Sequence, residues 1–209
     1  MILKDKAKRK NIKWAMLGVI LVVAALSFFA YQLYSPNTKT NIDSYVESQN
    51  IPSKGGNGKD VKKVVVFTDY QCPHCVNFHN DVVDKHLKEK IAKNEISYSE
   101  IQFPVIDDKS DQYAQMSKGI SKESNTDYWR FSELGYEFAT TDKDPMVTLE
   151  RMDVSDKQKA KYEKYFKAHK SDKVDTKSLQ DKFHVQQTPT VFVDGKMMSS
   201  EDEILKTLK

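Results

Sequence analysis

Cysteine is nearly absent from this sequence, whose 209 residues contain only Cys72 and Cys75. A tetrahedral zinc site needs four nitrogen or sulfur ligands. The chain has no second cysteine pair to complete such a site around Cys72, Cys75 and His79, so metal binding is not expected as its main role. No further cysteine could form a structural disulfide that competes with this pair. None follows the apolar run near the N-terminus either, which excludes a lipoprotein anchor.

The sequence also lacks a large excess of one charge, a phosphate-binding loop and coiled-coil repeats. The 33 basic and 30 acidic residues leave a net charge of +3, which gives no sign of a nucleic-acid groove. Glycine is sparse, and its one cluster, at residues 55–58, is not followed by the Gly-Lys-Ser/Thr sequence of a phosphate loop. No heptad seam is visible, so we expect a monomer.

The N-terminal region combines a basic start with an apolar run. Residues 1–13 hold six lysines and arginines against one aspartate, and the next 18 residues are uncharged and mostly apolar. That length is about the minimum for a transmembrane helix. The flanking lysines predict that the N-terminus lies inside and the rest of the chain outside the cell membrane. We therefore predict a cytoplasmic tail (1–13), a single-pass anchor (14–34) and a polar tether (35–60). A cleaved signal peptide, cut near residues 25–27, is the competing interpretation.

Both cysteines lie where a predicted strand leads into a predicted helix. Residues 61–67 are β-branched and apolar, as in a buried strand. Residues 73–93 place apolar side chains at three- and four-residue spacings, as in an amphipathic helix. Proline is favoured at the first helical position, because its missing N–H would have no partner there. Pro73 at that position makes Cys72 the N-cap residue.

The helix N-terminus predicts how the two thiols differ. Its amides and its dipole favour an anion at Cys72, and a protonated His74 adds to this effect. We therefore expect the pKa of Cys72 to fall from about 8.5 into the range of roughly 3.5–7.5. Cys75 lies one turn further along, where it can attack a mixed disulfide held on Cys72. The pattern indicates a dithiol/disulfide centre.

The rest of the chain alternates strands and helices. Residues 95–105 alternate apolar and polar side chains and predict a second strand, parallel to the first across the intervening helix. Residues 107–183 are largely helical. The closing segment contains Asp194-Gly195, a two-residue hairpin signal. Its strand, return strand and final helix are predicted at residues 190–193, 196–198 and 200–208.

Two segments resemble the DsbA-like branch of the thioredoxin superfamily, namely Asp69 to Cys75 (DYQCPHC) and Gln187 to Lys196 (QTPTVFVDGK). The resemblance implies an α/β, thioredoxin-like fold over residues 61–209, with a helical insertion at about 107–183. With the predicted anchor, the fold class is a thioredoxin-like domain preceded by an N-terminal transmembrane helix.

The same resemblance implies site residues outside the cysteine motif. A cis bond is implied between Thr188 and Pro189, which would leave the backbone of Thr188 free to pair with an extended substrate peptide. The Pro73-His74 pair matches the oxidising members of this branch. Thioredoxin-like proteins often bury an acid six residues before the first cysteine as a proton acceptor for the second, but this chain has Val66 there. Asp69 is either a substitute acting through water or an ordinary loop acid.

The resemblance predicts an extracytoplasmic thiol–disulfide oxidoreductase that introduces disulfides into secreted proteins and uses no cofactor. Its substrates are secreted or cell-surface proteins with free thiols, and a membrane partner, quinone-coupled by family analogy, reoxidises it. A disulfide reductase or isomerase, and a peptide-binding chaperone with incidental cysteines, are the alternatives. The expected catalytic residues are Cys72, Pro73, His74 and Cys75, and the expected substrate-binding residues are Thr188 and Pro189.

Overall fold

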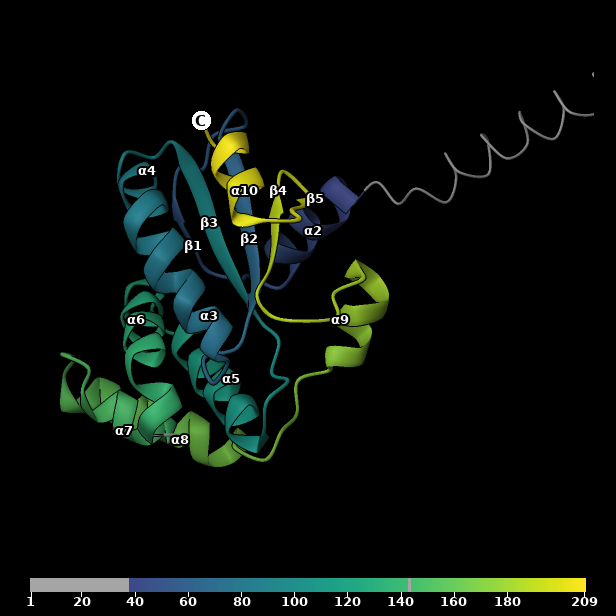
Figure 1. Cartoon of the computed structure of the whole chain (residues 1–209). Helices are drawn as coiled ribbons and strands as arrows, with labels where there is room; N and C mark the ends of the chain where they lie inside the picture. Colours follow the sequence, from purple (N-terminus) through teal and green to yellow (C-terminus); the bar gives the residue numbers. More distant parts are fainter. Residues whose placement is uncertain (1–37, 143) are drawn as a thin grey trace, which may run out of the picture. The chain divides into compact units, whose positions relative to one another are not determined.

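A five-stranded β-sheet with the strand order β1-β3-β2-β4-β5 lies at the centre of the computed structural model (Figure 1). The structure describes residues 38–142 and 144–209. The predicted tail (1–13), the anchor (14–34) and the first residues of the tether lie outside this part of the chain. Within it, no helix is both long and apolar enough to cross a membrane.

The strand, helix and strand predicted around the cysteines are confirmed. Strand β2 (Lys62–Thr68) pairs in parallel with β3 (Ile96–Gln102), in a register that sets Val66 opposite Glu100. The connecting helix runs without a break as α3 (Pro73–Phe78), η1 (His79–Leu87) and α4 (Lys88–Ala92). Its middle segment, η1, is a π-helix, which the sequence did not predict.

The closing hairpin is also confirmed. Strand β4 (Thr190–Val193) runs antiparallel to β2, and the edge strand β5 (Lys196–Met197) pairs with β4. Both turn residues have positive φ, 50° at Asp194 and 77° at Gly195, as a primed two-residue turn requires. Helix α10 (Glu201–Thr207) follows and packs Ile204 into the core.

The prediction of a polar tether over residues 35–60 is wrong for the part that the structure describes. Helix α2 (Thr38–Ser48) and the short strand β1 (Ser53–Gly55) lie there, and β1 pairs antiparallel with β3. The physical reason is a few apolar anchors among polar residues. Ile42 is fully buried, and the ring of Tyr45 packs edge-on against Phe183 with centroids 5.2 Å apart.

The helical insertion is present where it was expected and forms most of the helical mass. Figure 1 shows α5 to α8 grouped at the end of the sheet where α3 begins. The short helix α7 was not predicted, although Asp144 caps it by accepting a hydrogen bond from the Met146 amide and Pro145 occupies its first position. The five helices are α5 (Asp108–Ser121), α6 (Asn125–Asp142), α7 (Pro145–Glu150), α8 (Asp156–His169) and α9 (Thr176–Phe183).

Helices cover both faces of the sheet, so alternate residues of β2 and β3 enter two separate cores. Val64, Val66 and Tyr98 belong to the core under α3, the insertion helices α5 to α8 and α10. Val65 and Phe67 belong to the core under α2 and α9. Every position of the central strands is therefore at least partly covered, so the polar residues of these strands are also shielded from solvent.

Replacing Phe67 with alanine tests the second core, because this fully buried ring lies at its centre. Its centroid lies 5.5, 5.8 and 6.1 Å from those of Phe183, Phe192 and Phe103. We expect the Phe67→Ala variant to lose about 3–5 kcal/mol in free energy of unfolding, measured by urea titration. Val105→Ala, at a 45% exposed side chain, is the control and should change stability by no more than about 0.5 kcal/mol. Equal stability of the two variants would contradict this core.

Candidate active site

The two cysteines lie at the start of α3, directly after the carboxyl end of β2. Cys72 is the N-cap, with extended backbone angles (φ −81°, ψ 116°), and Pro73 occupies the first turn, as predicted. The amide of Cys72 donates to the carbonyl of Asp69 over 3.0 Å, and the amide of Cys75 donates to the carbonyl of Cys72 over 2.9 Å. These bonds place the two side chains one turn apart at the helix N-terminus.

The two thiols are both free and buried, but their acidities differ strongly. A hydrogen bond from the Cys75 thiol makes the largest contribution to lowering the pKa of Cys72, to about 5. Burial opposes this shift, whereas Thr188 and the amides of Cys75 and His74 add to it. The direction agrees with the sequence-based expectation, whereas the main cause is the neighbouring thiol. Contact with the Cys72 sulfur and burial raise the pKa of Cys75 far above its ordinary value.

The Thr188–Pro189 segment faces the first cysteine from the other end of the sequence. The bond between Thr188 and Pro189 is cis, as the resemblance implied. The Cys72 thiol donates to the carbonyl oxygen of Thr188 over 3.6 Å. The hydroxyl of Thr188 is buried without a hydrogen-bond partner among the described residues. The fold therefore brings Cys72, Cys75 and Thr188 together, and half-buried Pro189 follows directly.

Pro73 and His74 lie on the exposed side of the same turn. Within the described part of the chain, the His74 side chain forms no hydrogen bond or ion pair. It is open to solvent and to any molecule that approaches the sulfur of Cys72. The contribution of a His74 charge to thiolate stability stays a prediction.

Asp69 anchors the loop that carries the cysteines. Its carboxylate is 2% exposed and accepts hydrogen bonds from the amides of Gln71 (2.9 Å), Val105 (2.9 Å) and Ile106 (3.3 Å). Burial raises the pKa of Asp69, while these amide donors counteract the increase. Of the two interpretations left open by the sequence, this geometry fits the structural loop acid.

A second buried carboxyl, which the sequence analysis missed, lies behind the cysteines on β3. Glu100 is 2% exposed and accepts hydrogen bonds from the hydroxyls of Ser132 (2.7 Å) and Tyr98 (3.0 Å). Burial raises the pKa of Glu100. The Tyr136 hydroxyl is close enough to this carboxyl to lower its pKa, and it forms a 2.8 Å hydrogen bond with the hydroxyl of Thr68.

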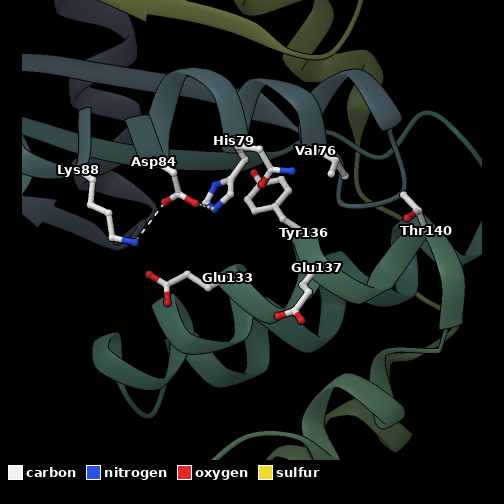
Figure 2. A pocket seen from close by; sticks show the side chains of 9 residues that line it. Val76, His79, Asp84, Lys88, Glu133, Tyr136, Glu137 and Thr140 are labelled. Carbon is white, nitrogen blue, oxygen red and sulfur yellow. Dashed lines mark hydrogen bonds and ion pairs between the residues drawn. The ribbon is translucent and has the colours of Figure 1, made fainter. Parts of the chain in front are cut away.

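Tyr136 also forms one wall of a cavity of about 380 Å³ between the cysteine helix and α6. Figure 2 shows the His79 ring lying flat against Tyr136, with centroids 4.2 Å apart and an interplanar angle of 19°. Burial lowers the pKa of His79 to about 4, so its ring is neutral at physiological pH. A carboxylate oxygen of Asp84 lies 3.9 Å from Nε2 of His79. Across residues 38–142 and 144–209, no cluster of three or more potential ligands is arranged to hold a metal ion.

Comparison with known proteins gives one family and several relatives with similar names. A family model described as thioredoxin matches residues 54–209. The probable disulfide bond formation protein D of Bacillus anthracis is 27% identical over 93% of this chain and 94% of its own length. Disulfide bond formation protein D of Bacillus subtilis is 29% identical, over 73% of this chain and 74% of its own length.

Solved structures agree with this chain in fold. The crystal structure of oxidised BdbD from Bacillus subtilis gives a TM-score of 0.59 at 24% identity, over 77% of this chain and 91% of that chain. The thiol-disulfide exchange protein alpha-DsbA2 from Wolbachia pipientis gives 0.62 at 18% identity, over 82% of this chain and 94% of that chain.

Proposed function

The chain belongs to the thioredoxin family, and within it to the DsbA-like thiol–disulfide oxidoreductases, and from this premise we propose that it is a dithiol oxidase. In this proposal the oxidised protein donates the disulfide of Cys72 and Cys75 to substrate proteins that carry free thiols. The relatives named for disulfide bond formation support the oxidising direction.

The observation that carries the proposal is the place of Cys72 at the N-terminus of α3, next to the Cys75 thiol, where its pKa is lowered. A thiol with a pKa of about 5 is almost fully ionised at neutral pH. A stabilised thiolate favours the reduced protein over the oxidised protein, so the disulfide becomes a stronger oxidant. The low pKa also makes Cys72 a good leaving group when a second substrate thiol resolves the mixed disulfide.

Each residue of the site has a defined part in the exchange. A substrate thiolate attacks the Cys72 sulfur, the bond between the two cysteines breaks, and Cys75 leaves as the thiolate. Pro73 and His74, both exposed beside Cys72, face the incoming substrate. The Thr188–Pro189 segment, which lies against the Cys72 sulfur, pairs with the extended substrate backbone.

We place this reaction on the outer side of the cell membrane. Disulfides persist in extracytoplasmic compartments, and residues 14–34 have the length and apolar character of a single-pass anchor behind a basic N-terminus. The substrates would be secreted or cell-surface proteins, and a membrane partner would restore the disulfide after each turnover. The catalytic domain in this proposal acts as a monomer.

The reduction potential of the full-length protein, equilibrated against glutathione buffers, tests the proposed direction. We expect a value near about −120 mV, as in strongly oxidising members of the superfamily. A value near about −270 mV would assign the chain to the reductases instead. Oxidation of a reduced, unfolded test protein by the oxidised chain gives the matching activity measurement.

A further inference from the structure

The proposed exchange requires a proton at Cys75, and the usual source is missing. Cys75 leaves its disulfide as a thiolate, although contact with the Cys72 sulfur and burial raise its pKa far above the ordinary value. It must therefore be protonated inside the protein each time the disulfide is consumed. Val66, six residues before Cys72, is apolar, but the strand register places Glu100 directly opposite it on β3.

We propose that Glu100 supplies this proton to Cys75, and takes it back in the reverse reaction, through the hydroxyls of Tyr136 and Thr68. This inference rests on the proposed redox function of the two cysteines. Thr68 is the last residue of β2, and its hydroxyl lies close enough to the Cys75 thiol to lower the pKa of that group. The same hydroxyl is hydrogen-bonded to Tyr136 over 2.8 Å, and the Tyr136 hydroxyl lies beside the Glu100 carboxyl.

The packing holds both ends of this path in place. The ring of Tyr136 is 3% exposed and rests on the neutral ring of His79, which fixes the plane of the phenol (Figure 2). The Glu100 carboxyl is oriented by its hydrogen bonds from Ser132 and Tyr98. Burial raises the pKa of Glu100 by more than the hydroxyl donors and the cation Lys54 lower it, so this acid can hold a proton closer to neutral pH than an exposed glutamate can.

The proton balance of the step is complete. The electron pair of the broken bond between Cys72 and Cys75 stays on the Cys75 sulfur, which takes the proton of the Thr68 hydroxyl. Thr68 takes the proton of Tyr136, and Tyr136 takes the proton of Glu100, which becomes a carboxylate. The oxidant is the protein disulfide, and the substrate dithiol is oxidised.

A cavity reaches Glu100 from a side of the molecule other than the cysteine motif. Glu100 and Tyr128 line a cavity of about 430 Å³ between the end of α2, α5 and the start of α9. The same cavity is lined by the exposed residues Lys118 and Lys173. It gives water a route to the vicinity of Glu100 from a face of the molecule other than the cysteine motif.

The groups around Glu100 that bear on its titration come from three elements and from the loop before α3. They are Tyr98 on β3, the cation Lys54 on β1, Tyr70 before α3, and three residues of α6, namely Tyr128, Ser132 and Tyr136. Lys54 is the only permanent charge in this set, and it lowers the pKa of Glu100 less than the Ser132 hydrogen bond does.

The test follows the step in which Cys75 acts, in the full-length chain. Reduced protein is mixed with oxidised glutathione, and acid-quenched samples are analysed by mass spectrometry for glutathione on Cys72. Resolution of this adduct requires Cys75 to lose its proton. We expect Glu100→Gln, which keeps the shape of the side chain, and Tyr136→Phe to slow resolution about 100-fold at neutral pH. Both variants should also replace the wild-type pH profile by a rate that rises steadily with hydroxide.

Tyr113→Phe is the matched control, because it removes an equally buried tyrosine hydroxyl from a 2.8 Å hydrogen bond to a threonine, Thr148, away from Glu100. It should leave the resolution rate and its pH profile as in the wild type. An infrared carbonyl band of a buried protonated acid, present in the wild type and in Tyr113→Phe, should be missing in Glu100→Gln.

Three outcomes would overturn the inference. One is a wild-type pH profile in Tyr136→Phe, which decides the matter even if Glu100→Gln does not fold. Another is equal slowing in Tyr113→Phe, which would mean that the loss reflects packing alone. The third is a wild-type chain that forms no adduct at all, and this result would remove the redox function together with the proton path.

Discussion

Replacing Cys72 with serine is expected to reduce the oxidation of substrate thiols to the uncatalysed rate. A substrate thiolate needs a disulfide sulfur to attack, and the serine variant can form no internal disulfide because Cys75 is the only other cysteine. The loss should appear directly when oxidation of a reduced test protein is followed with a thiol reagent. Retention of oxidase activity in Cys72→Ser would contradict the assignment of this sulfur.

Cys75→Ser should give a different result, since the attacked sulfur remains. The variant can enter a mixed disulfide with a substrate but cannot resolve it internally, so covalent adducts through Cys72 should accumulate. Non-reducing electrophoresis and mass spectrometry of the adduct measure this outcome. The double variant Cys72→Ser/Cys75→Ser is the control and should form none. Adducts that do not depend on Cys72 would indicate that a different chemistry operates.

The fold around the two cysteines could be predicted in part, because several of its sequence signals are local. The β-branched run before Cys72, the proline after it and the Asp194-Gly195 turn are each determined by neighbouring residues. Local signals of this kind predict strands, a helix start and a hairpin without knowledge of the tertiary structure. For this reason the framework of β2, α3, β3 and the closing hairpin could be predicted.

The parts that the sequence did not predict depend on tertiary packing. Helix α2 carries mostly polar residues, and its place in the fold depends on contacts such as that of Ile42 with the core on one face of the sheet. Glu100 belongs to an alternating strand, where a polar residue suggests a solvent-facing position. Because helices cover both faces of this sheet, that alternation does not separate inside from outside, and Glu100 is buried.

The position of Tyr136 next to the site could not be predicted from the sequence either. It lies on α6, in an insertion whose aromatic residues are mostly core, and only the packing of α6 against α3 brings its hydroxyl to Thr68. The useful sequence signal is Val66 itself. When the usual acid is missing from one strand, the residue opposite it in the neighbouring strand becomes a candidate for the same role, once the register is known.

Raising the pH is expected to stabilise the folded, reduced protein across a defined window. The pKa of Cys72 is lowered from 9.0 to about 5 on folding, so between these values the unfolded chain binds more protons than the folded one. This contribution to stability is therefore complete above about pH 9, declines as the pH falls from 9 to 5, and is gone below about 5.

Urea titration of the reduced full-length protein between these pH values measures the effect, with Cys72→Ser as the reference. Serine does not ionise in this range, so the stability of the wild type relative to the variant should grow as the pH rises. Cys75 does not obscure the window, because its raised pKa adds a pH dependence only above its ordinary value of 9.0. Parallel curves for wild type and variant would contradict a stabilised thiolate.

The same free energy links stability to the direction of the reaction. The thiolate exists only in the reduced protein, so whatever it contributes to folding also favours reduction of the disulfide. The Cys75 thiol makes the largest contribution to the low pKa of Cys72, so Cys75→Ala should raise that pKa more than Cys75→Ser, whose hydroxyl can still donate. The thiolate absorbance of Cys72 as a function of pH measures both values. An equal pKa in the two variants would mean that the helix N-terminus, and not the neighbouring thiol, stabilises the anion.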